Sequence, residues 1–204
     1  MIFIIKGDNK ITTHKKELSM HNYYDLMERK DAKIITAFNE DVKFFTQLIY
    51  NDRYSRIDAT AVDRKNRKCH LEIKQRTGKY GSFQEFLDKF DTIYLDCGKL
   101  DTFSNIMLAS GSSLNEQELF VSIFDDGDTI LIHNINQQQP MMWMPCQRVW
   151  NEGAKKWDVE HKVGLYWFNA LIYQKQDGHY KRLTDEEIET IRNKQVKYSK
   201  LYNE

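Results

Sequence analysis

Two short apolar segments of the chain carry charged side chains where a buried strand would normally place aliphatic ones. The first, residues 57–62, contains Asp58, and the second contains Glu72 and Lys74. Burying a charge is unfavourable unless the charge is paired, so acids and a lysine in strand-like segments point to a function. Two carboxylates beside an ammonium group can hold a divalent cation and position a water molecule for hydrolysis.

The two segments are expected to form a pair of strands joined by a polar turn at residues 63–68. Alternate residues of a strand point to the same face, so His70, Glu72 and Lys74 share one face of the second strand. The residues between them share the opposite face and can pack into a core: Cys69, Leu71 and Ile73. Asp58 from the neighbouring strand then completes a cluster of two carboxylates and one ammonium group.

An acid followed two positions later by lysine is a common pattern in this chain, because 29% of the residues are charged. Seven such triplets occur, so the triplet alone decides nothing. Only the triplet of Glu72 and Lys74 lies in an apolar segment that directly follows another apolar segment with an acid. That context favours a functional site over the alternative, a salt bridge on an edge strand.

Asp58, 13 intervening residues and then Glu72-Ile73-Lys74 resemble the signature of the PD-(D/E)XK nucleases, a superfamily of restriction-endonuclease-like enzymes. The resemblance covers about residues 36–125, and Ile57 stands where the motif name has proline. It implies an α/β fold in which a mixed central β-sheet is flanked by helices. About residues 136–204 would be a C-terminal region added to this restriction-endonuclease-like core, within a single domain of residues 1–204.

By this resemblance, the activity is metal-dependent hydrolysis of phosphodiester bonds, with DNA favoured over RNA as the substrate. Asp58 and Glu72 would bind one or two Mg²⁺ or Mn²⁺ ions, and the backbone carbonyl of Ile73 would be a further ligand. Lys74 would orient the attacking water and stabilise the developing charge. Glu40, on a helix before the strand pair, would supply a third acid. Its alternative role is a favourable charge in the first turn of that helix.

Polar residues around the motif are candidates for further contacts. Arg56 lies before the first acid, and the basic loop after Lys74 adds three candidates for nucleic-acid contacts: Gln75, Arg76 and Lys79. Arginine offers a planar, bidentate donor to phosphate groups. His70 and Gln75 are also candidates for supporting the metal ligands. The alternative for each arginine is a solvated turn.

The charge balance limits how the chain can bind nucleic acid. Its 30 basic and 30 acidic residues give a formal net charge of zero. Binding by bulk electrostatics is therefore not expected, and affinity would come from a local basic patch and from metal ions. Cys69, Cys97 and Cys146 are too few and too widely spaced for a zinc motif. We expect reduced thiols and a cytoplasmic protein without a membrane partner, since no segment approaches the ~20 apolar residues of a span.

Hydrophobic periodicity and capping residues predict the elements that position the motif. Helices are expected at residues 19–30 and 38–50, with Asn39 capping the start of the second helix. The remaining predicted elements follow in chain order: a helix from Ser82 to about 90, a strand at 92–96, a helix at 100–109, a hairpin at 119–133 and a helix from 184 to about 201. Asp125, Asp126 and Asp128 are assigned to the hairpin turn rather than to a metal loop.

Two other classes of function are compatible with these patterns. One is a catalytically inactive module on the nuclease fold that binds nucleic acid or protein, and the other is a structural interaction protein. Cleavage of both strands of a duplex would favour a homodimer, whereas nicking or trimming would favour a monomer. A cleavage assay on labelled DNA and RNA separates the classes.

Overall fold

The computed structural model describes residues 30–201 with seven gaps: 52–54, 78–80, 110–115, 137–140, 144–146, 152–155 and 161. For residues 107–109, 141–143, 147–151, 156–160 and 196–201 only the backbone is described. Nearly all of the helix predicted at residues 19–30 lies outside the described residues.

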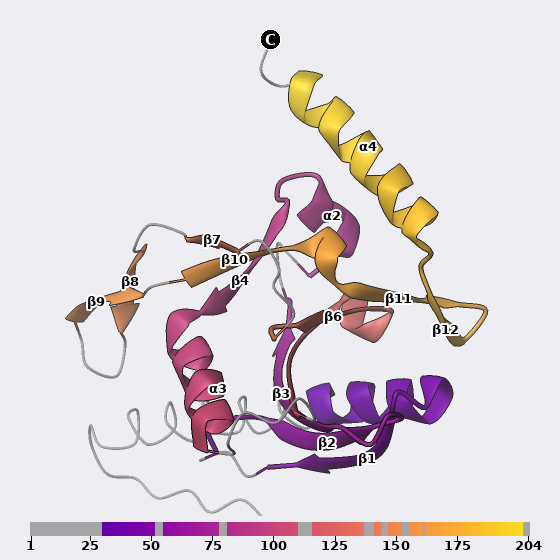
Figure 1. Cartoon of the computed structure of the whole chain (residues 1–204). Coiled ribbons are helices and arrows are strands. Elements are labelled where there is room, and N and C mark those ends of the chain that lie inside the picture. The colour runs from indigo at the N-terminus through magenta and orange to yellow at the C-terminus, as the bar shows by residue number, and fades with distance from the viewer. Residues whose placement is uncertain are drawn as a thin grey trace, which may run out of the picture.

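A seven-stranded sheet forms the centre of the described part of the chain (Figure 1). Its strands, in spatial order, are β1 (Phe45–Tyr50), β2 (Ala59–Asp63), β3 (Lys68–Gln75), β5 (Glu116–Phe124), β6 (Thr129–Asn134), β11 (Leu171–Gln176) and β12 (His179–Arg182). Neighbouring strands are antiparallel except for β3 and β5, which run parallel. The sheet curls strongly, and helices flank it, so the predicted mixed central sheet flanked by helices is confirmed.

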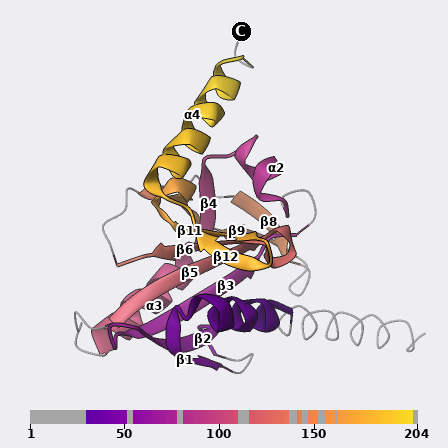
Figure 2. The same ribbon diagram turned by 90° about the vertical axis from the view of Figure 1, so that its right-hand side faces the viewer.

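Alternation along the strands divides the core between the two faces of the sheet. On β5, Val121 and Ile123 point to one face, whereas Phe120 and Phe124 point to the other. The helix of residues 30–42 covers the first face through Ile35 and Phe38, and it lies across the sheet from α3 in both views (Figures 1 and 2). The predicted packing of the faces of β3 is confirmed, because three alternate residues join this first core: Cys69, Leu71 and Ile73.

The second face is covered by the crossover between β3 and β5 and by the C-terminal elements. The crossover contains α2 (Phe83–Leu87), β4 (Thr92–Asp96) and α3 (Cys97–Ala109). β4 leaves the main sheet and pairs with β10 (Lys162–Tyr166), which also pairs with β7 (Met141–Trp143). A separate hairpin joins β8 (Gln147–Asn151) to β9 (Lys156–Glu160). The elements predicted at residues 82–109 are confirmed, although α2 ends at Leu87 rather than near residue 90 and α3 begins three residues earlier than expected.

The helix predicted at residues 38–50 is wrong. A helix instead ends at residue 42, Lys43 takes a left-handed conformation with φ 55°, and β1 follows. Asn39 does not cap a helix start: its side chain accepts from the N–H of Phe45 at 2.7 Å and so joins the helix end to β1. The apolar positions of this segment fit a helix and a short strand equally well, and pairing with β2 selects the strand.

The hairpin of β5 and β6 forms as predicted, and its acids serve the turn. Asp126 has φ 53° and Gly127 has φ 111°, which are left-handed values that Asp-Gly turns accommodate. The Asp125 carboxylate accepts from the hydroxyl of Thr129 at 2.9 Å and from the N–H of Phe83 at 3.2 Å. Asp125 therefore also anchors the start of α2 to the hairpin.

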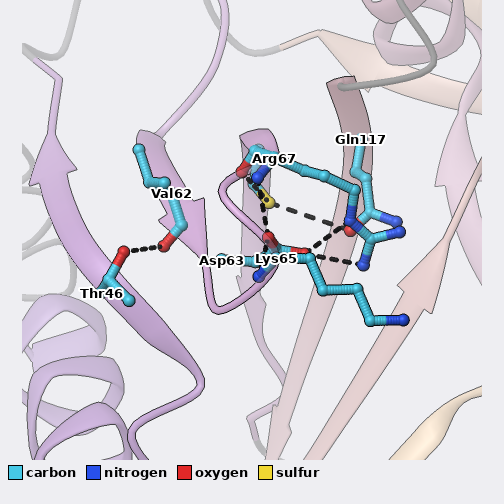
Figure 3. A network of polar contacts seen from close by, with 7 residues as sticks. Thr46, Val62, Asp63, Lys65, Arg67 and Gln117 are labelled. Atoms are coloured by element: carbon cyan, nitrogen blue, oxygen red, sulfur yellow. Dashed lines mark hydrogen bonds and ion pairs between the residues drawn. The ribbon is translucent and has the colours of Figure 1, made fainter.

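The turn between β2 and β3 is organised by a buried acid (Figure 3). Asp63 accepts from the N–H groups of Lys65 and Arg67, both at 2.8 Å, and pairs with the Arg67 guanidinium at 2.7 Å. The side chain of Arg64 bonds instead to the carbonyl groups of residues 42 and 43. These arginines are thus partnered within the protein, and they fix the turn that sets the register of β2 against β3.

The last helix, α4 (Asp185–Leu201), begins with the predicted capping box. The N–H of Thr184 donates to the Glu187 carboxylate at 2.7 Å, and the N–H of Glu187 donates to the Thr184 hydroxyl at 3.2 Å. Both views show α4 extending away from the sheet (Figures 1 and 2). Its contact with the body includes Gln195, whose amide accepts from the indole N–H of Trp167 and donates to two carbonyl groups of the α2 region.

Candidate functional site

Asp58 lies immediately before β2, where backbone hydrogen bonds hold it between two segments. Its N–H donates to the carbonyl of Leu71, and its carbonyl accepts from the N–H of Asn51, both at 2.9 Å. The antiparallel register of β2 and β3 places Asp58 across from Glu72. The Asp58 carboxylate also accepts from the N–H of Ile73, with Oδ2 2.6 Å from the nitrogen. The first acid is thus fixed against the segment that carries the second.

Glu72 is buried in the middle of β3, with 9% of its surface exposed. Its Oε2 atom lies 2.7 Å from the Nζ atom of Lys99, which is in the first turn of α3. The contact is an ion pair. The same ammonium group donates to the carbonyl of Arg56 at 3.2 Å. α3 therefore brings a cation to the buried acid.

Burial, followed by the negative charge of Asp58, raises the pKa of Glu72 from 4.5 to about 7. The positive charges of Lys99 and Lys74 act in the opposite direction. The two ammonium groups therefore offset only part of the unfavourable free energy of ionising a buried acid beside a second acid. A divalent cation bound between the carboxylates would offset more of it.

Lys74 lies two positions after Glu72 on the same face of β3, and its side chain is exposed. Its charge acts on Glu72, which requires the two groups to be close. The structure thus brings together three of the predicted site residues: Asp58, Glu72 and Lys74. Ile73 contacts Asp58 through its N–H, and ligation through its carbonyl oxygen stays a prediction.

Glu40 lies away from this cluster. Its helix, residues 30–42, packs through Ile35 and Phe38 on the face of the sheet that contains Leu71, whereas Glu72 points to the other face. Glu40 is exposed in the last turn of that helix rather than in the predicted first turn. Its predicted role as a third metal ligand therefore gains no support from its position.

The residues predicted to contact nucleic acid do not form one group beside the acid pair. Arg56 is exposed beside the acid pair, and its carbonyl is tied to Lys99. Gln75 lies on the opposite face of β3 from Lys74, where its amide donates to Asp126 at 3.3 Å. Lys79 lies outside the described residues. Of the candidates in this loop, none is placed beside Lys74 by the described contacts.

Arg76 points into the protein rather than outward. Its guanidinium donates to the Ser122 hydroxyl at 3.3 Å and to the carbonyl of Tyr94 at 3.4 Å, and it lies 5.7 Å from the ring centroid of Phe120. Burial lowers the pKa of Arg76 to about 10. The guanidinium therefore joins β3 to the second face of the sheet, and a contact with nucleic acid stays a prediction.

Lys99 is the neighbour of the acid pair that the sequence patterns did not identify. A lysine in the first turn of a helix is unfavourable, because the positive end of the helix dipole repels it. α3 has no acid in its first turn to compensate. That anomaly is the one local signal that could have indicated an anionic partner for Lys99.

His70 lies beside other acids than the two predicted metal ligands that it was expected to support. Its ring lies near the carboxylates of Glu116 and Glu118 on β5, rather than supporting Asp58. Burial and the charge of Glu116 raise the pKa of Glu118 to about 7, against a smaller opposing effect of Lys68. The two glutamates were not identified from the sequence, since the pairing of β3 with β5 joins segments 48 positions apart.

Comparisons with known proteins do not assign the chain to a family. No family model matches it, and searches of curated proteins and of solved structures find no significant match. Within the described residues, no helix combines the length and the apolar character needed to cross a membrane.

Proposed function

We propose that the protein is a metal-dependent nuclease that hydrolyses phosphodiester bonds, with DNA favoured over RNA as the substrate. The observation that carries the proposal is the hydrogen bond from the N–H of Ile73 to the Asp58 carboxylate. It sets the first acid directly against the segment that carries Glu72 and Lys74. Two acids and a lysine on one face of a strand pair are the groups that metal-assisted hydrolysis requires.

The order of the elements supports the same proposal. A helix at residues 30–42 precedes three antiparallel strands, β1 to β3, and a crossover containing helices leads to β5, which is parallel to β3. This order is consistent with the restriction-endonuclease-like core that the motif resembles. The elements after β6 would then be the added C-terminal region.

The acid pair fits a hard divalent cation. Asp58 and Glu72 offer carboxylate oxygens, which Mg²⁺ and Mn²⁺ prefer. The raised pKa of Glu72 reflects first its burial and then the negative charge of Asp58, which Lys99 and Lys74 do not fully balance. When bound, such an ion supplies a water molecule of lowered pKa and neutralises charge on the phosphate.

Each side chain of the site has a separate role in the proposed hydrolysis. Asp58 and Glu72 hold the cation, and the N–H of Ile73 fixes the orientation of Asp58. Lys74, which is exposed beside Glu72, orients the attacking water and donates to the negatively charged phosphate oxygens. The water oxygen forms a new bond to phosphorus, the bond to the leaving sugar oxygen breaks, and that oxygen takes up a proton.

One observation favours a second candidate, a binding module without catalysis. The ammonium group of Lys99 lies 2.7 Å from Glu72 and partly balances the acid without any metal ion. A site of this kind can be a structural ion pair in a protein that binds nucleic acid or another protein without cleaving it.

A cleavage assay tests the proposal. The purified chain is incubated with labelled single- and double-stranded DNA and RNA, with Mg²⁺ or Mn²⁺ and with EDTA. We expect cleavage of DNA that needs the metal ion and falls by about 100-fold or more in Lys74→Ala, because charge stabilisation in a transition state is typically worth that much. Lys181→Ala, an exposed lysine on β12, is the matched control and should cleave as the unchanged chain does.

Three other outcomes of the assay would contradict the proposal. Cleavage that persists in Lys74→Ala indicates a contaminating nuclease and rejects the assigned role of Lys74. Retarded migration of the nucleic acid without cleavage, under all metal conditions, supports the binding module. Neither binding nor cleavage supports a structural protein.

A further inference from the structure

A second cluster of metal-ligand side chains lies on β3 and β5. The parallel register places His70 across from Glu118, and Glu116 lies two positions before Glu118 on the same face of β5. One ligand atom from each residue lies within 4.8 Å of the other two. The Nε2 atom of His70 and the Oε2 atom of Glu116 are 3.7 Å apart.

The cluster is largely buried, and two of its members, His70 and Glu118, carry polar atoms without a hydrogen-bond partner in the part of the chain that the structure describes. His70 is 3% exposed, Glu118 is 1% exposed, and the side chain of Glu116 is 13% exposed. Among the described residues, neither ring nitrogen of His70 and neither carboxylate oxygen of Glu118 has a hydrogen-bond partner. Buried polar groups are nearly always partnered, so two adjacent unpartnered groups indicate a ligand that both can bind.

The backbone holds the cluster in place. The N–H of Glu118 bonds to the side chain of Asn136, and its carbonyl accepts from the N–H of Ile135 at 2.8 Å. The parallel pairing with β3 fixes the opposite side of the same strand. Lys68, the cross-strand neighbour of Glu116, has an exposed side chain and leaves the buried oxygens of Glu118 unpartnered.

We propose that His70, Glu116 and Glu118 bind a divalent transition-metal ion, with Zn²⁺ as the expected occupant. An imidazole nitrogen beside two carboxylates suits a borderline ion such as Zn²⁺, whereas Mg²⁺ and Ca²⁺ prefer oxygen ligands alone. The distance of 3.7 Å between His70 and Glu116 is close to the edge of about 3.3 Å expected for a tetrahedral site with bonds of ~2.0 Å. Three protein ligands leave one position for water.

This site does not rest on the proposed nuclease activity. It differs in ligand chemistry from the acid pair of Asp58 and Glu72, and it joins β3 to β5 rather than β2 to β3. A bound ion would link strands from two distant parts of the chain, so its expected effect is on the stability of the fold as well as on metal content.

Calorimetric titration of the untagged, chelator-treated full chain with Zn²⁺ tests the proposal. We expect one equivalent of Zn²⁺ to bind, and a weakening of at least 10-fold in His70→Gln and in Glu118→Gln. Asp58→Asn/Glu72→Gln is the matched control and should change the Zn²⁺ affinity by less than about 3-fold. Co²⁺ added in place of Zn²⁺ should give visible absorption without thiolate bands, which excludes binding by the cysteines.

Glu118→Gln keeps the proposal testable if His70→Gln does not fold. This variant removes a buried, unpartnered carboxylate while keeping its size, so without metal it should melt at a higher temperature than the unchanged chain. Zn²⁺ should then raise the melting temperature of the unchanged chain and not that of the variant. Equal affinity for Zn²⁺ in Glu118→Gln and the unchanged chain, or loss of binding only in Asp58→Asn/Glu72→Gln, would overturn the site.

Discussion

Lys99 occupies a helix position that normally favours the opposite charge. In the first turn of α3 its ammonium group meets the positive end of the helix dipole, and the ion pair of 2.7 Å with Glu72 offsets this repulsion. The lysine thus finds its anionic partner on β3, where Glu72 faces α3. In the proposed nuclease, Lys99 would share Glu72 with a bound metal ion and would limit repulsion within the acid pair when no ion is present.

The raised pKa of Glu72 predicts how stability depends on pH. In the folded chain Glu72 keeps its proton up to about pH 7, whereas in the unfolded chain the carboxyl group loses its proton near pH 4.5. Between these values the folded state binds more protons, so the contribution of Glu72 to the free energy of unfolding falls as pH rises, by up to about 1.4 kcal/mol per pH unit. Glu72→Gln removes this contribution, so its stability relative to the unchanged chain should increase from pH 5 to pH 7 and level off above.

Urea unfolding in EDTA at several pH values measures this difference. The difference in the free energy of unfolding between Glu72→Gln and the unchanged chain is taken at each pH. This difference cancels the pH-dependent contributions of other buried groups, including His133, whose burial lowers its pKa to about 4. The exposed Glu40→Gln is the matched control and should show a constant difference. A constant difference for Glu72→Gln as well would contradict the assigned burial of its charge.

At the scale of elements, α4 is held to the body by the side chain of Gln195. Its amide accepts from the Trp167 indole at 3.0 Å and donates to the carbonyl groups of Leu87 and Phe90 at 2.7 and 2.6 Å. Arg192 adds a contact over the ring of Phe168. One polar side chain therefore joins α4 to both the end of α2 and the segment after β10.

Gln195→Leu should lower the free energy of unfolding by about 2 kcal/mol. The change leaves the Trp167 N–H and two carbonyl groups without their partner, and an unpaired buried group typically costs 1–3 kcal/mol. Asn193→Leu, an exposed change on the same helix, is the matched control and should have an effect within about 0.5 kcal/mol. Urea unfolding, monitored by tryptophan fluorescence, measures the change in the free energy of unfolding for both variants. Equal changes in Gln195→Leu and Asn193→Leu would show that the bonds of Gln195 do not hold α4.

Local signals explain which elements could be predicted from the sequence. The Asp-Gly turn after β5 and the capping box at Thr184 are set by a few adjacent residues, and both form as expected. The strand β1 was not predicted, because its spacing also fits a helix and its pairing with β2 is a tertiary contact. For the same reason Asp58, Glu72 and Lys74 could be grouped from neighbouring strands. Lys99 reaches Glu72 only through the crossover, and Glu118 reaches His70 only through the pairing of β3 with β5.

On the strand pair β2 and β3, the apolar packing and the polar side chains lie on opposite faces of the sheet. One face of β2 and β3 is apolar and lies under the helix of residues 30–42, whereas the other face carries both clusters of ligand-type side chains. Behind the acid pair and the group around His70, the same apolar layer packs against the helix of residues 30–42. A metal ion bound on the polar face should stabilise the entire fold.

Mg²⁺ should raise the melting temperature of the unchanged chain and leave that of Asp58→Asn/Glu72→Gln unchanged. A ligand that binds only the folded state stabilises it by about 2.7 kcal/mol at 100 times its dissociation constant. Thermal unfolding with increasing Mg²⁺ measures the shift, and Glu118→Gln, which leaves the acid pair intact, is the matched control that should retain it. Equal shifts in the unchanged chain and in the double variant would reject the acid pair as the Mg²⁺ site.

The parallel pairing of β3 with β5 also bears on which segments of the chain can change in length during evolution. The crossover of residues 76–115 must close a long loop before the two strands meet, but loop-closure entropy grows slowly, by about 0.6 kcal/mol for each doubling of loop length. Insertions in the connections of this crossover, outside α2, β4 and α3, are therefore inexpensive while the β2–β3 hairpin, which carries Asp58 and Glu72, stays intact. The segment beside the acids is thus free to diversify in length, and with it the shape that a substrate meets.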